Sequence, residues 1–171
     1  RFIANVDWSS YPLARSDASP IPTALRRLVA SSSESDAEDA YWGLDNRVVV
    51  QGRFFEAVVP LLMAVGIALQ VTRLATPARY RLMELVTEIA LGHPHEDVSA
   101  ADDLAARVSE CLDALGGVLV AQLSSEDARV RLNVLEVIST RSGQKELKSL
   151  VRDLLANDPD EKVRNRANAL A

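Results

Sequence analysis

The chain has 171 residues, of which 48% are hydrophobic, 25% are charged and only 5% are aromatic, with a net charge of −5 at pH 7. This balance argues against non-specific binding of duplex nucleic acid, which needs a cluster of Lys and Arg, although it leaves room for a local basic strip, and it would suit a basic partner. A single cysteine excludes an internal disulfide, and no apolar run reaches the roughly 18 residues of a membrane span, so we expect a cytoplasmic protein outside the membrane.

The first twenty residues, which include Pro12 and Pro20, lack a helical period. We therefore predict an irregular leader over residues 1–20, followed by a single helical domain over residues 21–171. A short helix comes first, with Leu25, Leu28 and Val29 on one face. In the next helix, Ser33 or Ser35 is the predicted cap, acids occupy the first turn, and Gln51-Gly52 is the stop. Its predicted apolar face consists of Ala37, Tyr41, Leu44 and Val48.

Residues 53–70 predict a helix that is apolar nearly all round and lies in the middle of the core, with a kink or restart at Pro60. Thr76-Pro77 predicts a cap and a first-turn proline for a helix that ends at Gly92. Residues 92–100 are then expected to form a loop. A long helix from Asp102 is expected to bend at Gly116-Gly117.

Ser124, with Asp127 three residues later, predicts the opening of another helix, which breaks at Gly143. The helix after it has a predicted apolar face of Leu147, Leu150, Val151, Leu154 and Leu155. Asp158-Pro159 repeats the cap-and-proline device before the last helix. The pattern gives about eight helices in four hairpins and no strand, because the β-prone segment at 47–51 sits in a helical context.

Two segments of the chain resemble each other. ARYRLMELVTEI at 78–89 is echoed by ARVRLNVLEVI at 128–138, which matches Arg81 with Arg131, and a shorter echo matches Asp127, Val130 and Arg131 with Asp160, Val163 and Arg164. Self-similarity of this kind predicts stacked helix pairs. In each copy, the acid precedes the helix, the Val points into the core and the Arg reaches back to an acid.

DARVRLNVLEVI and DPDEKVRNRANAL resemble the second-helix signature of HEAT-type repeats in the armadillo-like superfamily. Residues 6–91 resemble bacterial HEAT-repeat proteins of unassigned function, with a Trp-containing leader, a helix pair, a Gln-Gly step and an Ala/Pro-rich apolar helix. The resemblance implies an all-α fold, an α-α superhelix of about four helix pairs. It also implies a habit of binding other proteins, without catalytic chemistry.

Aromatic and polar side chains are densest near residues 41–54, a mixture that is typical of interface anchors but also of a filled gap between helix pairs. Six arginines recur on the second helices, where pairing with Glu84, Glu88 and Glu136 is favoured over a binding strip. From both groups the candidate protein-binding residues are Tyr41, Trp42, Asp45, Asn46, Arg47, Gln51, Arg53, Arg81 and Arg131.

Other candidate sites are weaker. His93, His95 and Glu96 lack the further ligand that a zinc site needs. The acids at 34–39 and Asp45 favour helix capping and a solvated face over a grip on a basic partner. No phosphate-binding loop, catalytic triad or dinucleotide fingerprint occurs, so we expect neither an enzyme nor a cofactor.

The sequence therefore predicts a non-enzymatic protein–protein interaction scaffold, in a sharper form an immunity-type inhibitor of a basic toxin. Two alternatives stay open: a nucleic-acid-binding HEAT-like repeat, which needs a continuous basic groove, and a HEAT-like lyase, which needs a polar pocket with convergent carboxylates. The sequence gives no indication of an oligomeric state.

Overall fold

The computed structural model describes residues 6–11, 20–71, 73–141 and 145–170. This part of the chain is mostly helical, as predicted. The elements are a 3₁₀ helix η1 (Trp8–Ser10), nine α-helices, α2 (Ile21–Ala30), α3 (Glu34–Val48), α4 (Val58–Leu69), α5 (Thr76–Leu91), α6 (Ala101–Ala114), α7 (Gly116–Gln122), α8 (Ala128–Ser139), α9 (Lys145–Leu155) and α10 (Glu161–Asn168), and three short strands, β1 (Val49–Val50), β2 (Arg53–Phe54) and β3 (His93–Pro94). Most of the predicted leader, with Pro12, and the predicted break at Gly143 lie outside the described residues.

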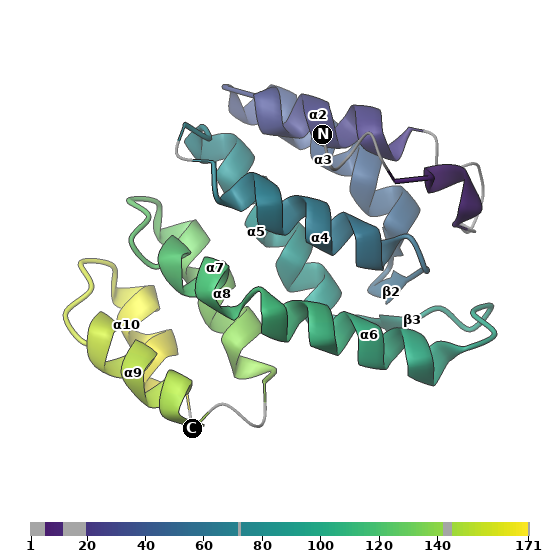
Figure 1. The fold of residues 1–171 in the computed structure, drawn as a ribbon. Helices are drawn as coiled ribbons and strands as arrows, with labels where there is room; N and C mark the ends of the chain where they lie inside the picture. Colours follow the sequence, from purple (N-terminus) through teal and green to yellow (C-terminus); the bar gives the residue numbers. More distant parts are fainter. Residues whose placement is uncertain (1–5, 12–19, 72, 142–144, 171) are drawn as a thin grey trace.

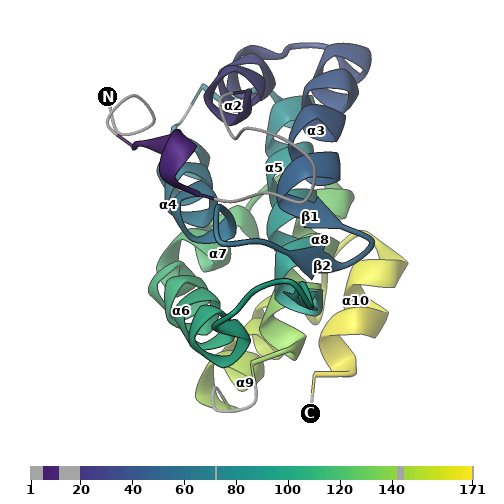
Figure 2. The ribbon, with the colours of Figure 1, turned by 90° about the vertical axis from the view of Figure 1, so that its right-hand side faces the viewer.

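Consecutive helices pair along the chain. Helix α2 packs on α3, α4 on α5, α7 on α8, and α9 on α10. The second members of these pairs also contact one another in order, α3 with α5, α5 with α8, and α8 with α10, while α4 contacts α6 and α7. Figures 1 and 2 show the result: the chain descends pair by pair, with α4, α6 and α9 on one side and α5, α8 and α10 on the other. The face of α3, α5 and α8 positions the candidate site.

Three of the described α-helices begin with a side-chain cap. The Ser33 side chain accepts a hydrogen bond from the Asp36 amide, as predicted, and Asp127 and Asp160 cap α8 and α10. The predicted caps at Ser124 and Asp158 are wrong, because Ser124 donates to the Ala121 carbonyl and Asp158 forms an ion pair. Thr76 is the first residue of α5 and not its cap, since Ala75 holds the extended cap position.

The prediction of no strand is wrong for residues 49–54 and 93–94. β1 pairs with β2 in antiparallel register, Val49 with Phe54, and β2 pairs with β3 in parallel register. The turn residues Gln51 and Gly52 both have positive φ, 54° and 74°, the geometry that joins two strands through a two-residue hairpin. The β-branched valines therefore leave the helix at Val48 and form the first strand of the hairpin.

Two predictions for residues 53–70 are also wrong. Helix α4 begins at Val58, so Pro60 lies in the first turn, where its missing N–H leaves no helical bond unmade and no kink follows. The helix is not buried all round either, because Met63 and Ile67 are 47% and 48% exposed. The bend predicted at Gly116-Gly117 is confirmed, since α6 ends at Ala114 and α7 begins at Gly116.

The buried faces follow the predicted periodicity except in α9. The four predicted apolar residues of α3 are buried, but Leu150 and Leu154 of α9 are 60% and 61% exposed. Helix α9 packs mainly on α10, so its covered face is narrow: Val151 and Leu155 are buried, and Leu147 is partly buried against the core. In the described ranges, no helix combines the length and the apolar character required to cross a membrane.

The three related segments share one register, which confirms the predicted match of Val130 with Val163 and differs from the predicted match between α5 and α8. Ala78, Val130 and Val163 each stand third in α5, α8 and α10 and are fully buried. The residue that follows each of them is an arginine, which donates hydrogen bonds to backbone carbonyls that precede its helix. Arg131 donates to the carbonyls of Ser125 and Glu126, and Arg164 donates to those of Asp158 and Pro159. Arg79 donates to the carbonyl of Leu69. Arg131 therefore corresponds to Arg79, and the predicted match with Arg81 is wrong by two residues.

Gly92 is required by a close approach of two chain segments. A Cβ atom at this position would lie 2.8 Å from the Gly52 carbonyl oxygen and 3.0 Å from the Glu88 carbonyl oxygen. Because both neighbours are backbone atoms, Gly92→Ala is expected to lower the free energy of unfolding by about 1–3 kcal/mol, as for other overpacked sites. Urea denaturation measures the change. Gly116→Ala, which meets no atom within 4 Å, is the control, and an equal loss in both variants would contradict the argument.

The polar face of α3, α5 and α8

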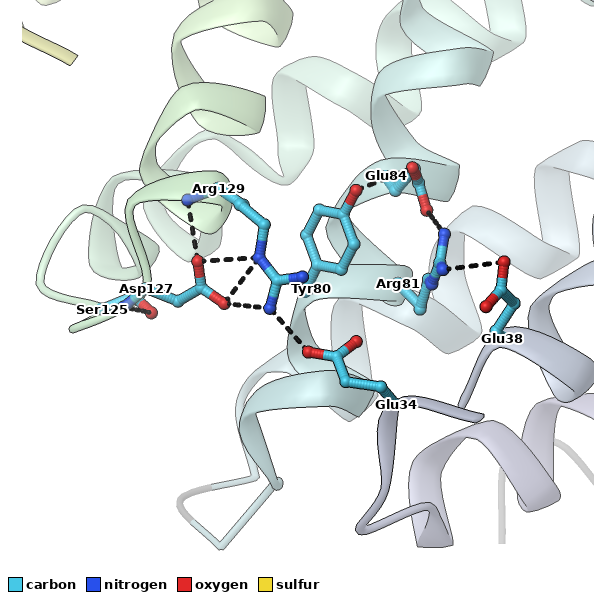
Figure 3. Close-up of polar contacts among 8 residues, drawn as sticks. All are labelled: Glu34, Glu38, Tyr80, Arg81, Glu84, Ser125, Asp127 and Arg129. Atoms are coloured by element: carbon cyan, nitrogen blue, oxygen red, sulfur yellow. Dashed lines mark hydrogen bonds and ion pairs between the residues drawn. The ribbon is translucent and has the colours of Figure 1, made fainter. Parts of the chain in front are cut away.

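Arg81 lies at the centre of a polar network on this face (Figure 3). Its guanidinium donates to Glu84 at 2.6 Å and pairs with Glu38 of α3 at 3.3 Å. It also lies 5.3 Å and 5.2 Å from the ring centroids of Tyr41 and Tyr80, within the range of cation–π attraction. Arg81 thus joins α3 to α5 through charges and aromatic rings together.

Arg129 extends the network to α8. Its Nη2 lies 2.7 Å from both Glu34 Oε1 and Asp127 Oδ2, and its guanidinium lies 4.2 Å from the Tyr80 ring centroid (Figure 3). Hydrogen bonds from Arg129 hold the pKa of Asp127 below its ordinary value, against the opposing effect of burial. The Tyr80 hydroxyl donates to Glu84 at 2.9 Å, so one connected set of side chains spans α3, α5 and α8.

The other recurring arginines are also engaged within the chain. Arg79 donates to Gln122 and to the Leu69 carbonyl, Arg131 pairs with Asp158 at 2.7 Å, and Arg166 pairs with Glu136 at 2.7 Å. The prediction of intramolecular pairing is therefore confirmed. Arg166 ties α10 to α8, Arg131 ties α8 to the residue that precedes α10, and Arg79 ties α5 to the ends of α4 and α7, so these arginines do not form an open basic strip.

Two acids meet where α3 packs against α5. Asp45 is only 9% exposed. Burial, the negative charge of Glu88, hydrogen bonding with Glu88 and the charge of Glu84 together raise the pKa of Asp45 to about 7. Burial and the negative charges of Asp45, Glu88 and Glu84 raise the pKa of the Tyr41 hydroxyl far above its ordinary value, so it stays protonated.

A pocket of about 440 Å³ opens beside the acid pair. Its wall consists of Gly52, Glu84, Thr87, Glu88, Leu91, Gly92 and Asn133. The Asn133 Nδ2 atom is buried and has no hydrogen-bond partner among the described residues. Leu91 at the rim is 61% exposed. The pocket is therefore acidic on its α5 side and apolar at one edge.

No family model, curated protein or solved structure matches the chain. The resemblance to HEAT-type repeats therefore stays a prediction. Function has to be argued from the pocket and the surrounding network.

The structure brings three of the predicted site residues together and disperses the others. Tyr41, Asp45 and Arg81 join the network and the acid pair, whereas Arg131 is buried in its pair with Asp158. The remaining candidates lie on the outer side of α3 and in the hairpin. On α3, Trp42 is 47% exposed and packs edge-on against Tyr41 with ring centroids 5.2 Å apart, and Asn46 donates a hydrogen bond to the Trp42 carbonyl. Arg47 is half-buried. In the hairpin, Gln51 forms the turn and Arg53 pairs with Glu96 at 3.2 Å.

Sequence reasoning missed the pocket wall. The sequence pattern indicates Glu84 and Glu88 only as partners for arginines, and it gives no reason to select Thr87 or Asn133. One signal was available in the sequence. Glu84 and Glu88 stand at i and i+4 on one helix, where like charges repel each other, so another group must offset that repulsion. Thr87 also ties α5 to α8, since its hydroxyl donates to the Met83 carbonyl at 2.9 Å and the Asn133 carbonyl at 3.3 Å.

The two histidines have different surroundings. His93 is exposed in β3, whereas His95 stacks on Phe55 with ring centroids 4.6 Å apart and accepts the Asp97 amide. Within the described ranges, no group of three or more His, Cys, Asp and Glu is placed to hold a metal ion.

Proposed function

We propose that the chain is a short HEAT-like solenoid that acts as a non-enzymatic protein-binding scaffold. What supports the solenoid is the order of contacts, in which α3, α5, α8 and α10 pack one after the other and the third and fourth positions of three of them are equivalent. Helix pairs stacked in this way leave an extended face available to a partner. The face of α3, α5 and α8 is the proposed binding surface.

The acidic pocket is the observation that carries this proposal. Glu84 and Glu88 line it, with Asp45 behind them, so the ammonium or guanidinium of a partner would find opposite charge at its base. The exposed Leu91 at the rim offers apolar contact for the long stem of a Lys or Arg side chain. The proposed partner is therefore a protein with a basic segment, which also fits the net charge of −5.

The network around the pocket is suited to binding with little loss of side-chain freedom. Arg81 and the Tyr80 hydroxyl hold Glu84 by hydrogen bonds of 2.6 Å and 2.9 Å. Side chains that are already ordered lose less entropy when a partner arrives. In its sharper form the proposal is an immunity-type inhibitor that covers a basic surface of a toxin.

Leu91→Arg is expected to weaken a basic partner's affinity by at least about tenfold. The substitution places a cation at the mouth of the acidic pocket, and the position is exposed enough to leave folding intact. Affinity capture from host cells with the wild-type chain identifies the partner, and calorimetric titration of the purified partner then gives the affinity of each variant.

Leu154→Arg is the matched control, because Leu154 has the same 61% exposure but lies on α9. It should bind as the wild type does. Equal affinities for both variants, or a captured partner that carries no basic segment, would contradict the proposal.

The two alternatives fare differently. A nucleic-acid-binding groove is not supported, since the recurring arginines are occupied within the chain, and we expect titration with DNA or RNA to give no salt-dependent signal. The lyase alternative required a polar pocket with convergent carboxyls, and the pocket at α5 meets that condition. We favour binding because Arg81 and the Tyr80 hydroxyl hold the Glu84 carboxylate in one position, which suits a fixed charge for docking better than a group that exchanges a proton with a substrate.

A further inference from the structure

Trp42 is a large aromatic side chain that stays at the surface of α3. It is 47% exposed, and its ring packs against the Tyr41 ring with the centroids 5.2 Å apart and an interplanar angle of 69°. Tyr41 is itself only 2% exposed and lies 5.3 Å from the Arg81 guanidinium. The Trp42 ring is therefore supported on one side by an ordered neighbour and open to solvent on the other. Tryptophan is among the residue types that contribute most to the affinity of protein interfaces.

The charges beside Trp42 on α3 are negative. Glu38 and Asp39 stand four and three residues before it, so their side chains lie one helical turn away on the same side of the helix. Asp39 is exposed. Glu38 pairs with Arg81 at 3.3 Å, but its side chain keeps 49% of its surface exposed. A positively charged group that approaches the ring therefore meets carboxylates next to it.

The same face already combines aromatic rings with cations. The Arg81 guanidinium lies 5.3 Å from the ring centroid of Tyr41 and 5.2 Å from that of Tyr80, and the Arg129 guanidinium lies 4.2 Å from the Tyr80 centroid. Nearby carboxylates hold both guanidinium groups in position (Figure 3). An indole ring attracts a cation more strongly than a phenol ring does. Trp42 and its neighbouring acids offer the same combination to a cation from outside the chain.

Consecutive contacts join Trp42 to the acidic pocket. Trp42 contacts Tyr41, and Tyr41 contacts Arg81. Arg81 then donates to Glu84 in the pocket wall at 2.6 Å. Helix α3 also packs directly on α5, which carries that wall. The ring and the pocket therefore belong to one surface, and a single segment of a partner can cover both.

We propose that Trp42 is a second anchor of the binding surface, which takes a Lys or Arg side chain of the partner by a cation–π contact while the acidic pocket takes another. This inference rests on the proposed function and adds to it, because the basic segment of the partner then needs two cationic side chains, one for each anchor. Once one of them is bound, the second contact forms within the same complex and raises the affinity further. The ring sets no hydrogen-bond geometry, so either kind of cation fits.

Calorimetric titration with two synthetic peptides tests the second anchor. Hexa-arginine supplies guanidinium groups, and hexa-citrulline is its uncharged analogue of nearly the same shape. The wild type is expected to bind hexa-arginine and not hexa-citrulline. Trp42→Ala should weaken the binding of hexa-arginine about two- to fivefold, the effect of one cation–π contact at an exposed site. Trp42→Phe, which keeps a ring, should lose less, and Trp42→Leu, which is apolar without a ring, should lose as much as Trp42→Ala.

Ile67→Ala is the matched control, because Ile67 is 48% exposed but lies on α4, and it should bind hexa-arginine as the wild type does. An unchanged affinity in Trp42→Ala or Trp42→Leu would overturn the second anchor, and Leu91→Arg then decides separately whether the pocket stands. A loss in Trp42→Ala with none in Leu91→Arg would support the anchor and contradict the pocket. If the wild type bound no hexa-arginine, or bound hexa-citrulline equally well, both would be overturned.

Fluorescence of the wild type keeps the test decisive if the Trp42 variants do not fold. The chain has two tryptophans, and Trp8 is only 5% exposed, so the emission that a dissolved ion can quench comes from Trp42. Compared with N-acetyltryptophanamide, caesium should quench this emission more and iodide less, because carboxylates stand beside the ring. Hexa-arginine should protect the ring from caesium. A preference for iodide, or no protection by the peptide, would overturn the proposal.

Discussion

Asp158→Ala is expected to lower the free energy of unfolding by about 3–5 kcal/mol, the usual loss when one partner of a buried ion pair is removed. Arg131 and Asp158 are 5% and 8% exposed, and their charged atoms lie 2.7 Å apart. The Ala variant leaves the guanidinium buried without its counter-charge. It also removes the acceptor for the Asp160 amide, 2.9 Å away at the start of α10. Equilibrium urea denaturation at neutral pH gives the value.

Glu96→Ala is the control for that experiment. It breaks the ion pair of Arg53 and Glu96, whose side chains are 42% and 74% exposed, and surface pairs of this kind contribute about 1 kcal/mol or less. If both variants lost the same stability, burial of the Arg131–Asp158 pair would not be the reason for its effect. The comparison separates a structural arginine from one at the surface.

Leu82→Ala is expected to cost about 2–5 kcal/mol, the range for truncation of a fully buried leucine. Leu82 has no exposed surface and stands seventh in α5, as Val134 stands in α8 and Ala167 in α10, both fully buried as well. The position therefore serves the packing between neighbouring helix pairs. Thermal or urea unfolding measures the loss.

Met63→Ala provides the comparison, because Met63 belongs to the apolar helix α4 but is 47% exposed. Its truncation should change stability by no more than about 0.5 kcal/mol, as for ordinary surface sites. A large loss of stability in Met63→Ala together with a small loss in Leu82→Ala would contradict the assignment of Leu82 to the core and of Met63 to the surface.

Periodicity predicts most of the fold because the helices are amphipathic. The apolar face of α3 is one confirmed example, and the break before Gly116 is another, since a glycine pair marks a bend whatever surrounds it. The sequence does not predict the strands, for a physical reason. Val49 and Val50 follow a strong helical pattern, and only the positive φ of Gln51 and Gly52, together with pairing to a segment near residue 93, makes an extended conformation favourable there.

The sequence predicts part of the candidate site: Tyr41 and Asp45 of α3 and Arg81 of α5, but not the acids of the pocket wall. Tyr41 and Asp45 stand on α3 within an aromatic and polar cluster that the sequence displays directly. Glu84 and Glu88 join them only because α5 packs against α3 at one particular rotation, and no local pattern encodes that rotation. The exposure of Leu150 in α9 has a similar origin, because the number of neighbours a helix has decides how wide a face it buries.

The parallel pairing of β2 with β3 has a consequence for how the molecule comes apart. Stacked helix pairs ordinarily fray one pair at a time from either end. Here the pairing of Arg53–Phe54 with His93–Pro94 joins the segment that follows α3 to the segment that follows α5, and so links the first helix pair to the second. The first two helix pairs must then unfold together, whereas α9 and α10 can unfold separately. Unfolding is therefore expected to begin more readily at the C-terminal end.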